Sequence, residues 1–178
     1  MKATFFVTNQ MPKYRYLLKE IVKDGHAIAV HTLTHQWSIY SSKTSYLNDF
    51  NAMHKIILDD TGVDTKLFRF PGGTNNTVSR SYSRGIMTAM AKYMTENGYI
   101  YFDWNVDSGD TRGYSSSQIA SNTIAQIKNR HQSVVLMHDL KNTTVEAIKT
   151  IIKYGLDNGY EFAVLDESTP RVQFSPAN

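Results

Sequence analysis

Cysteine is absent from the 178 residues of this chain. Its absence excludes a disulfide framework and thiol catalysis. No apolar stretch approaches the roughly 20 residues that would span a bilayer. The first residues also lack the basic start, apolar core and small-residue cleavage site of a signal peptide. We therefore expect no membrane span and no targeting segment within this sequence.

An excess of charge of one sign is also missing. The chain has 19 Lys and Arg against 16 Asp and Glu, a formal net charge of +3, and the cations are spread along the sequence. This weak balance argues against nucleic acid as a partner and suits an anionic surface such as a cell wall. No internal repeat, low-complexity tract or linker divides the chain, so we predict one domain over residues 1–168 and a loose tail over 169–178.

The apolar pattern alternates between two periods. Between short apolar runs typical of buried strands, apolar residues recur at helical spacing in five segments. The predicted strands cover residues 3–8, 26–31, 67–70, 99–106, 133–137 and 162–165. The predicted helical stripes cover residues 14–22, 47–57, 86–94, 119–127 and 145–152, with Ser115 or Ser116 and Thr143 or Thr144 as N-caps. This alternation predicts a parallel α/β fold, and the absence of a Gly-x-Gly-x-x-Gly turn favours a closed or nearly closed barrel over a Rossmann fold.

Polar side chains follow most of these strands at their carboxyl ends, where side chains distant in sequence converge in α/β folds. His31 and His35 follow the second strand, four residues apart. On a helical turn this spacing lets both imidazoles reach one metal ion, and zinc would need a further ligand, such as a carboxylate from another strand. A pair of surface or structural histidines is the equally weighted alternative.

His138 ends the fifth strand, where an imidazole suits general acid or base catalysis at neutral pH. Asp107 and Asp110, after the fourth strand, are positioned to orient it. A hydrogen-bonded core histidine is the alternative for His138, and Asp139 is alternatively the cap of the following helix.

Arg69 and the Pro71-Gly72-Gly73 turn follow the third strand. A guanidinium can bind a carboxylate, and backbone N–H groups at glycines can approach a substrate oxygen. A simple chain turn after the strand is the alternative explanation of the two glycines. Four aromatic residues are either sugar-stacking or core residues, with the core preferred for the last two: Trp37, Tyr40, Phe102 and Trp104.

Five segments together resemble the polysaccharide deacetylase family, the NodB-homology domains of carbohydrate esterase family 4. They occur in the family's order and approximate spacing. These segments are Ala3-Thr-Phe-Phe-Val7, Gly25-His26 through His31-Thr-Leu-Thr-His35, Arg69-Phe-Pro-Gly-Gly73, Asp107-Ser-Gly-Asp110 and Leu136-Met-His-Asp139. The resemblance implies a distorted (β/α) barrel and a divalent metal, usually Zn2+, that activates water to hydrolyse acetyl groups on a polysaccharide. An N-acetylglucosamine polymer, peptidoglycan before chitin or xylan, is the substrate we expect.

The resemblance also implies a role for each matched residue. His31 and His35 are metal ligands, His138 is the general acid, and Asp110 orients it. The remaining roles follow the third and fifth segments. Arg69 holds the catalytic base, the turn at Pro71 and Gly72 binds substrate with the Gly72 N–H on the oxyanion, and Leu136 lines the acetyl-methyl pocket.

Two features depart from the family pattern. Thr111 stands where a tryptophan is usual after the second Asp, and the Asp-Asp segment with the base and third metal ligand normally precedes the Ala3–Val7 string. We therefore expect a barrel that lacks its first βα unit in this chain, weak metal binding through two histidines, and impaired activity. We favour a sequence that begins after the Asp-Asp segment over a degenerate, non-catalytic carbohydrate-binding protein. An open edge favours dimerisation or strand exchange, and the family resemblance implies an extracellular or cell-wall location.

Overall fold

A computed structural model describes residues 1–177, which form two compact units. The larger unit contains Lys2–Asp103 and the segment from Ala163 onward, and the smaller unit contains Trp104–Phe162. Each unit is built on its own parallel sheet. Each is described by itself below.

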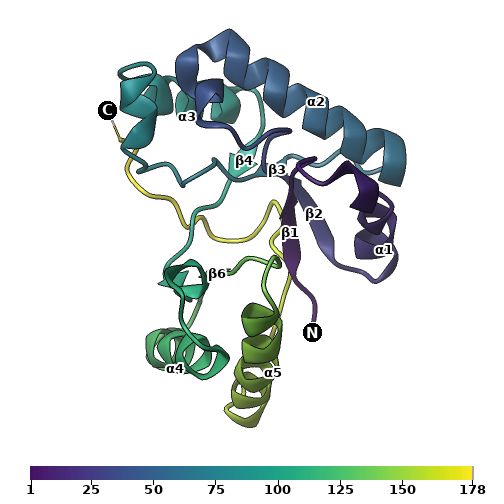
Figure 1. The fold of residues 1–178 in the computed structure, drawn as a ribbon, viewed down its shortest axis with the longest axis vertical. Coiled ribbons are helices and arrows are strands. Elements are labelled where there is room, and N and C mark those ends of the chain that lie inside the picture. Colours follow the sequence, from purple (N-terminus) through teal and green to yellow (C-terminus); the bar gives the residue numbers. More distant parts are fainter. Residues whose placement is uncertain (178) are drawn as a thin grey trace. The chain divides into compact units, whose positions relative to one another are not determined.

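The larger unit holds four strands in the order β1-β2-β3-β4, each paired in parallel with its neighbour (Figure 1). The helices α1, α2 and α3 connect these strands in turn. The strands are β1 (Thr4–Val7), β2 (Ala27–Val30), β3 (Leu67–Phe68) and β4 (Ile100–Tyr101). The helices are α1 (Leu17–Lys23), α2 (Lys43–Thr61) and α3 (Ile86–Glu96), with 3-10 turns η1 (Pro12–Tyr14), η2 (Trp37–Ser41) and η3 (Val78–Ser81).

Aromatic and methionine side chains fill the core of the larger unit. Phe50 of α2 lies edge-to-face against Phe68 of β3, with ring centroids 5.5 Å apart, and Tyr46 packs on Phe70. Met53, Met87, Met90 and Met94 are buried beside them. The expected stripe on α3 is confirmed, because Ile86, Met90 and Met94 are all buried. This core fixes the carboxyl ends of β2 and β3, where the candidate site residues begin.

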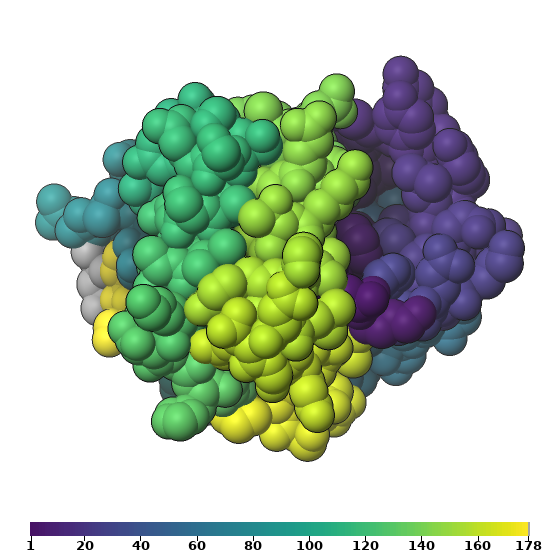
Figure 2. All heavy atoms as spheres, turned by 90° about the horizontal axis from the view of Figure 1, so that it is seen from below, coloured from purple at the N-terminus to yellow at the C-terminus, as the bar shows by residue number. Residues whose placement is uncertain are grey.

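The smaller unit pairs β5 (Val106–Asp107) with β6 (Val135–Leu136), again in parallel. Its helices α4 (Ser116–Ile127) and α5 (Asn142–Asp157) lie side by side (Figures 1 and 2), and Ile119 and Ala120 pack with Ala147 and Ile151 between them. A 3-10 turn, η4 (Asp110–Arg112), follows β5. The Ser115 cap is confirmed, since Ser115 and Gln118 form a reciprocal capping box.

The α/β class and the parallel pairing of the strands are therefore confirmed, but three local predictions are wrong. Residues 99–106 form two strands in different sheets, because the Asp103 N–H donates to the Val172 carbonyl and pairing passes to Val134 only at Asn105 and Val106. Residues 162–165 form no strand, because the Leu165 N–H donates to the Thr4 hydroxyl and not to a backbone carbonyl. Neither Thr143 nor Thr144 caps α5, whose N-cap is Lys141.

The segment after residue 168 is a tail without helix or strand, as far as Ala177, but it is not loose. Phe174 N–H donates to the Asp103 carboxylate at 2.8 Å, and Ala177 N–H donates to the Thr74 carbonyl at 3.0 Å. Gln173 donates to the Tyr101 carbonyl. These bonds fix the tail on the larger unit. No helix within residues 1–177 is both long and apolar enough to cross a membrane.

Candidate active site

The two histidines of the second segment lie at the end of β2, in a loop and not on a helical turn. Thr32 and His35 have positive φ angles of 69° and 54°, a conformation that costs non-glycine residues free energy. This backbone, and not helical spacing, brings the His31 and His35 rings together, with centroids 4.8 Å apart at 64°. The expectation of a helical turn is therefore wrong, while the predicted proximity of the pair is confirmed.

One ring nitrogen of His31 is already occupied. Its Nδ1 lies 2.8 Å from the Arg69 carbonyl oxygen, so Nδ1 carries the proton and donates, and Nε2 keeps its lone pair. Donation from the far nitrogen to a carbonyl is how metal-binding histidines are commonly oriented. The donor chemistry of His31 therefore fits zinc.

Asp49 of α2 holds the loop between the two histidines. Its carboxylate accepts hydrogen bonds from the N–H groups of Leu33 and Thr34, at 2.7 and 3.1 Å, and from the Thr34 hydroxyl at 2.7 Å. Three bonds to one carboxylate offset the unfavourable φ angles. No spacing pattern points to Asp49, because a single acidic residue within a helical pattern is normally solvent-exposed.

Arg69, which follows β3, is buried, with 7% of its surface exposed. Its Nε and Nη2 donate to the carbonyls of Phe102 and Asp103 at 2.8 and 3.1 Å, and its guanidinium lies 4.1 Å from the Phe6 ring centroid. Burial lowers the pKa of Arg69 to about 10, against the opposing effect of the Asp103 charge. The guanidinium therefore remains charged at neutral pH.

Asp103 is fully buried and was not predicted as a site residue. Its carboxylate accepts from the Thr74 N–H at 2.9 Å, the Thr74 hydroxyl at 2.5 Å and the Phe174 N–H. It thus fixes the segment that follows the glycine turn. A charged residue inside an apolar run requires a buried partner, and that requirement is the signal that could have identified it.

The turn itself is held from two sides. The buried Tyr40 hydroxyl donates to the Pro71 carbonyl at 2.9 Å, and the Asn76 amide donates to the Gly73 carbonyl at 2.8 Å. Within the described residues the Gly72 N–H has no hydrogen-bond acceptor, and Gly72 is exposed. Tyr40 and Phe102 are buried, so neither presents a face to a sugar, whereas Trp37 is half-buried and packs on Gly72.

Gly72 tests how tightly the turn is packed. At its φ of 77°, an added Cβ would lie 2.6 Å from Trp37 Cη2, whereas at Gly62, with φ 75°, it would meet nothing within 4 Å. We expect Gly62→Ala to cost about 1–2 kcal/mol of unfolding free energy from backbone strain alone. Gly72→Ala should cost about 1–3 kcal/mol more because of the close contact.

Urea denaturation of the two variants measures this difference. Adding Trp37→Leu to Gly72→Ala should remove the extra loss. Equal destabilisation by the two glycine substitutions would contradict the close packing of Trp37 on the turn.

The smaller unit carries the other candidate residues. Asp110 Oδ1 lies 3.0 Å from His138 Nδ1, and Asp110 Oδ2 accepts from the His138 N–H at 2.6 Å and the Thr144 hydroxyl at 3.1 Å. The Asp110 side chain is 3% exposed and that of His138 is 41% exposed. Nδ1 of His138 therefore donates to the carboxylate, and Nε2 remains for a reacting group.

The electrostatics of this pair favour an ionised carboxylate. Burial acts to raise the pKa of Asp110, but the hydrogen bonds and charge of His138 and the Thr144 hydroxyl together hold it below its usual value. Thr144, expected as a helix cap, is thus part of the site. Asp107 does not share this role: its carboxylate bonds Arg112 at 2.7 Å and the Gly109 N–H. Asp139 is exposed and does not cap α5, and Leu136, in β6, is half-buried two residues before His138.

The predicted site residues thus form two groups. His31, His35, Arg69, Pro71 and Gly72 lie in the larger unit, and Asp110, Leu136 and His138 in the smaller. Throughout residues 1–177, no group of three or more His, Cys, Asp or Glu side chains is placed to hold a metal ion. His31 and His35 therefore fit zinc as two of its protein ligands and do not make a full set.

The chain is a parallel α/β protein with a histidine pair at one strand end and a buried carboxylate–histidine pair at another. Such side chains are typical of a hydrolytic enzyme. A family model described as polysaccharide deacetylase matches residues 1–89, half of the chain. The chain belongs to the polysaccharide deacetylase family.

The chain is similar to two curated proteins and to one solved structure that bear deacetylase names. A putative polysaccharide deacetylase, YheN, of Bacillus subtilis is 32% identical over 94% of this chain and 59% of its own length. A peptidoglycan-N-acetylglucosamine deacetylase of Bacillus cereus is 28% identical over 94% of this chain and 61% of its own. The crystal structure of the catalytic domain of a peptidoglycan N-acetylglucosamine deacetylase from Eubacterium rectale is 42% identical, with TM-score 0.97, covering 99% of this chain and 82% of that one. The chain spans about three fifths of the two curated relatives.

Proposed function

We propose that this chain carries the catalytic domain of a metal-dependent deacetylase that removes acetyl groups from an N-acetylglucosamine polymer, with peptidoglycan as the substrate. The observation that carries the proposal is the Asp110–His138–Thr144 arrangement, together with the oriented imidazole of His31. We place the protein outside the cell or at the cell wall, because that is where its polymer lies. A polysaccharide is its partner, and dimerisation through β1, an edge strand of the four-stranded sheet, is the oligomeric state we propose.

The reaction is the addition of water to the acetyl carbonyl carbon, followed by cleavage of the carbon–nitrogen bond. When bound, a divalent metal such as Zn2+ supplies an activated water and polarises the carbonyl oxygen. His31 and His35 would hold it as two of its ligands. The products are acetate and the free amine of the sugar.

Each side chain near the bond has a distinct task. His138, protonated at Nε2, gives its proton to the leaving nitrogen, while Asp110 holds Nδ1 and stabilises the cationic ring. The role we propose for the Gly72 N–H is donation to the oxygen that gains charge. Arg69 supports the catalytic base through its charge, and Leu136 lines the space for the acetyl methyl group.

Two measurements test the proposal. Zinc calorimetry on residues 1–178 should show weak binding that is lost in His31→Ala and in His35→Ala, and a tight stoichiometric site would contradict the two-ligand assignment. Acetate release from peptidoglycan and from chitooligosaccharides is measured on this chain and on the chain extended upstream in its reading frame. Release by the extended chain, reduced at least 100-fold by His138→Ala, supports the proposal. No release by either chain favours a carbohydrate-binding protein without catalysis.

A further inference from the structure

We propose that an open hollow in the larger unit binds an oxyanion of the polymer, a carboxylate or a phosphate, and so selects an anionic wall polymer over neutral chitin. This inference rests on the proposed function and names the substrate feature that the domain reads. The hollow has a volume of about 790 Å³. Its lining residues are Thr77, Arg80, Ser81, Arg84 and Gly85.

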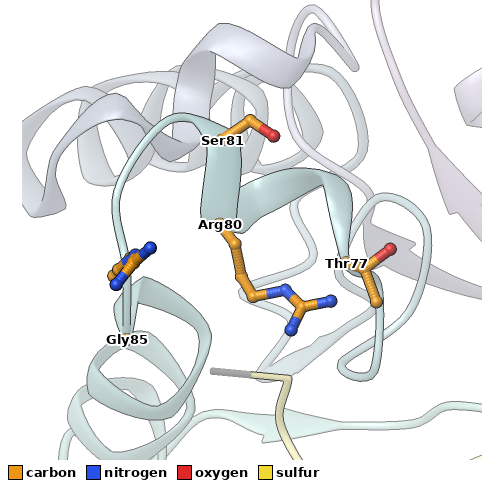
Figure 3. A pocket seen from close by; sticks show the side chains of 5 residues that line it. Thr77, Arg80, Ser81 and Gly85 are labelled. Atoms are coloured by element: carbon orange, nitrogen blue, oxygen red, sulfur yellow. The ribbon is translucent and has the colours of Figure 1, made fainter.

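The described residues that line the hollow are cationic or polar, and none of them has a carboxylate. In Figure 3 the Arg80 side chain extends from η3 between Thr77 and Gly85. Arg84 makes no hydrogen bond or ion pair with any other residue in 1–177, and both arginines are exposed. Thr77, Ser81 and Gly85 complete the lining. A guanidinium presents a planar set of donors that matches a carboxylate or a phosphate, so the hollow suits an oxyanion.

The segment that carries the hollow contains no acidic residue. Residues 65–95 contain no Asp or Glu, while the cations within them include Lys66, Arg80, Arg84 and Lys92. The charge of Lys92 is paired with Glu96, and that of Lys66 with Asp64. The charge of Arg84 has no such acidic partner within the described chain, so an anionic ligand is its available counterion.

The hollow is fixed to the candidate active site through Asn76. This buried side chain donates to the Gly73 carbonyl and accepts from the Ser79 N–H at 3.0 Å, and the Ser79 hydroxyl donates to the Asn76 carbonyl at 3.2 Å. η3, which carries Arg80, is therefore held to the turn that contains the exposed Gly72. The hollow and the turn thus belong to one hydrogen-bonded segment of the larger unit.

Tyr82 gives the same region an apolar contact. Tyr82 is 46% exposed and lies between Arg80 and Arg84 in the chain, and Val78, 40% exposed, comes two residues before Arg80. An exposed aromatic residue in a segment with exposed arginines suits a sugar ring that carries a negative substituent. Peptidoglycan has carboxylates on its peptide stems, whereas chitin has no charged group.

Binding of three probes at low and high salt tests the inference without any need for turnover. The probes are muramyl dipeptide for a carboxylate, poly(glycerol phosphate) for a phosphate, and chitopentaose as a neutral sugar. We expect the chain to bind at least one anionic probe, more weakly at high salt, and Arg84→Gln to weaken this binding about tenfold. Arg80→Gln together with Arg84→Gln should weaken it further.

Arg130→Gln is the matched control, because Arg130 is an exposed arginine of the smaller unit and its replacement changes the net charge equally. It should leave binding of the anionic probes unchanged, and no variant should alter binding of chitopentaose. Which anionic probe binds identifies a peptide stem or a phosphate polymer as the source. Equal loss in Arg130→Gln, no loss in Arg84→Gln, or no binding of either anion would overturn the inference. Failure of deacetylation alone leaves these outcomes unaffected and contradicts only the proposed reaction.

Discussion

Replacement of Asp103 by asparagine is expected to lower the free energy of unfolding by about 3–5 kcal/mol, the usual cost of leaving a buried charge without the opposite charge that compensates it. The change keeps the size of the side chain but removes the negative charge that opposes the desolvation of Arg69. It also places an amide donor where a carboxylate oxygen now accepts from Thr74 or Phe174. Both effects destabilise the same segment of the larger unit.

Urea denaturation measures the loss, with Asp59→Asn as the control. Asp59 lies on α2, and its ion pair with Lys55 is exposed. Its removal should cost at most about 0.5 kcal/mol. A shift in Asp103→Asn no larger than that of the control would contradict the structural role of Asp103.

The elements that the sequence predicted well are those in which the local pattern and the tertiary contacts agree. The run from Ala3 to Thr8 contains β1, and the apolar stripe on α3 is buried as expected. The run from Tyr99 to Val106 predicts one strand because most of its residues are apolar or aromatic. Its backbone changes partner at Asp103, and partners 28 or more residues away leave no trace in a local pattern.

The same distinction applies to the site. His31, His35, Arg69, Asp110 and His138 were found because they occur in recognisable segments. Asp49 and Asp103 were missed because each acts alone, on backbone N–H groups that any sequence provides. The four-residue separation of His31 and His35 suggests a helical turn, and this expectation is wrong. The left-handed backbone at Thr32 and His35 brings the two imidazole rings together instead. Motifs thus identify the candidate site residues, and the structure adds the residues that hold them.

Asp110→Asn is expected to make the smaller unit less stable by about 1–3 kcal/mol at pH 7, the cost of unsatisfied buried polar groups. The pKa of Asp110 is lower in the folded chain than the value near 3.9 of an unfolded aspartate, so its ionisation favours the folded state. This contribution is fully present above about pH 4 and is lost as the pH falls through the lowered pKa. The difference in unfolding free energy between the unchanged protein and Asp110→Asn should therefore be widest at pH 5–7 and narrow below pH 4.

Urea midpoints measured from pH 7 to pH 3 on both proteins isolate this effect. Asp60, Asp64 and Asp166 also have lowered pKa values, through hydrogen bonds to Arg15, to Lys66, and to Ser168 and Thr169 respectively, but they are common to both proteins and cancel in the difference. A gap that stays constant with pH would contradict the ionised state of Asp110. Because the same carboxylate binds His138 Nδ1, a gap that narrows below pH 4 would mean that the ionised form of Asp110 stabilises the smaller unit and holds the imidazole by Nδ1, with Nε2 as its other nitrogen.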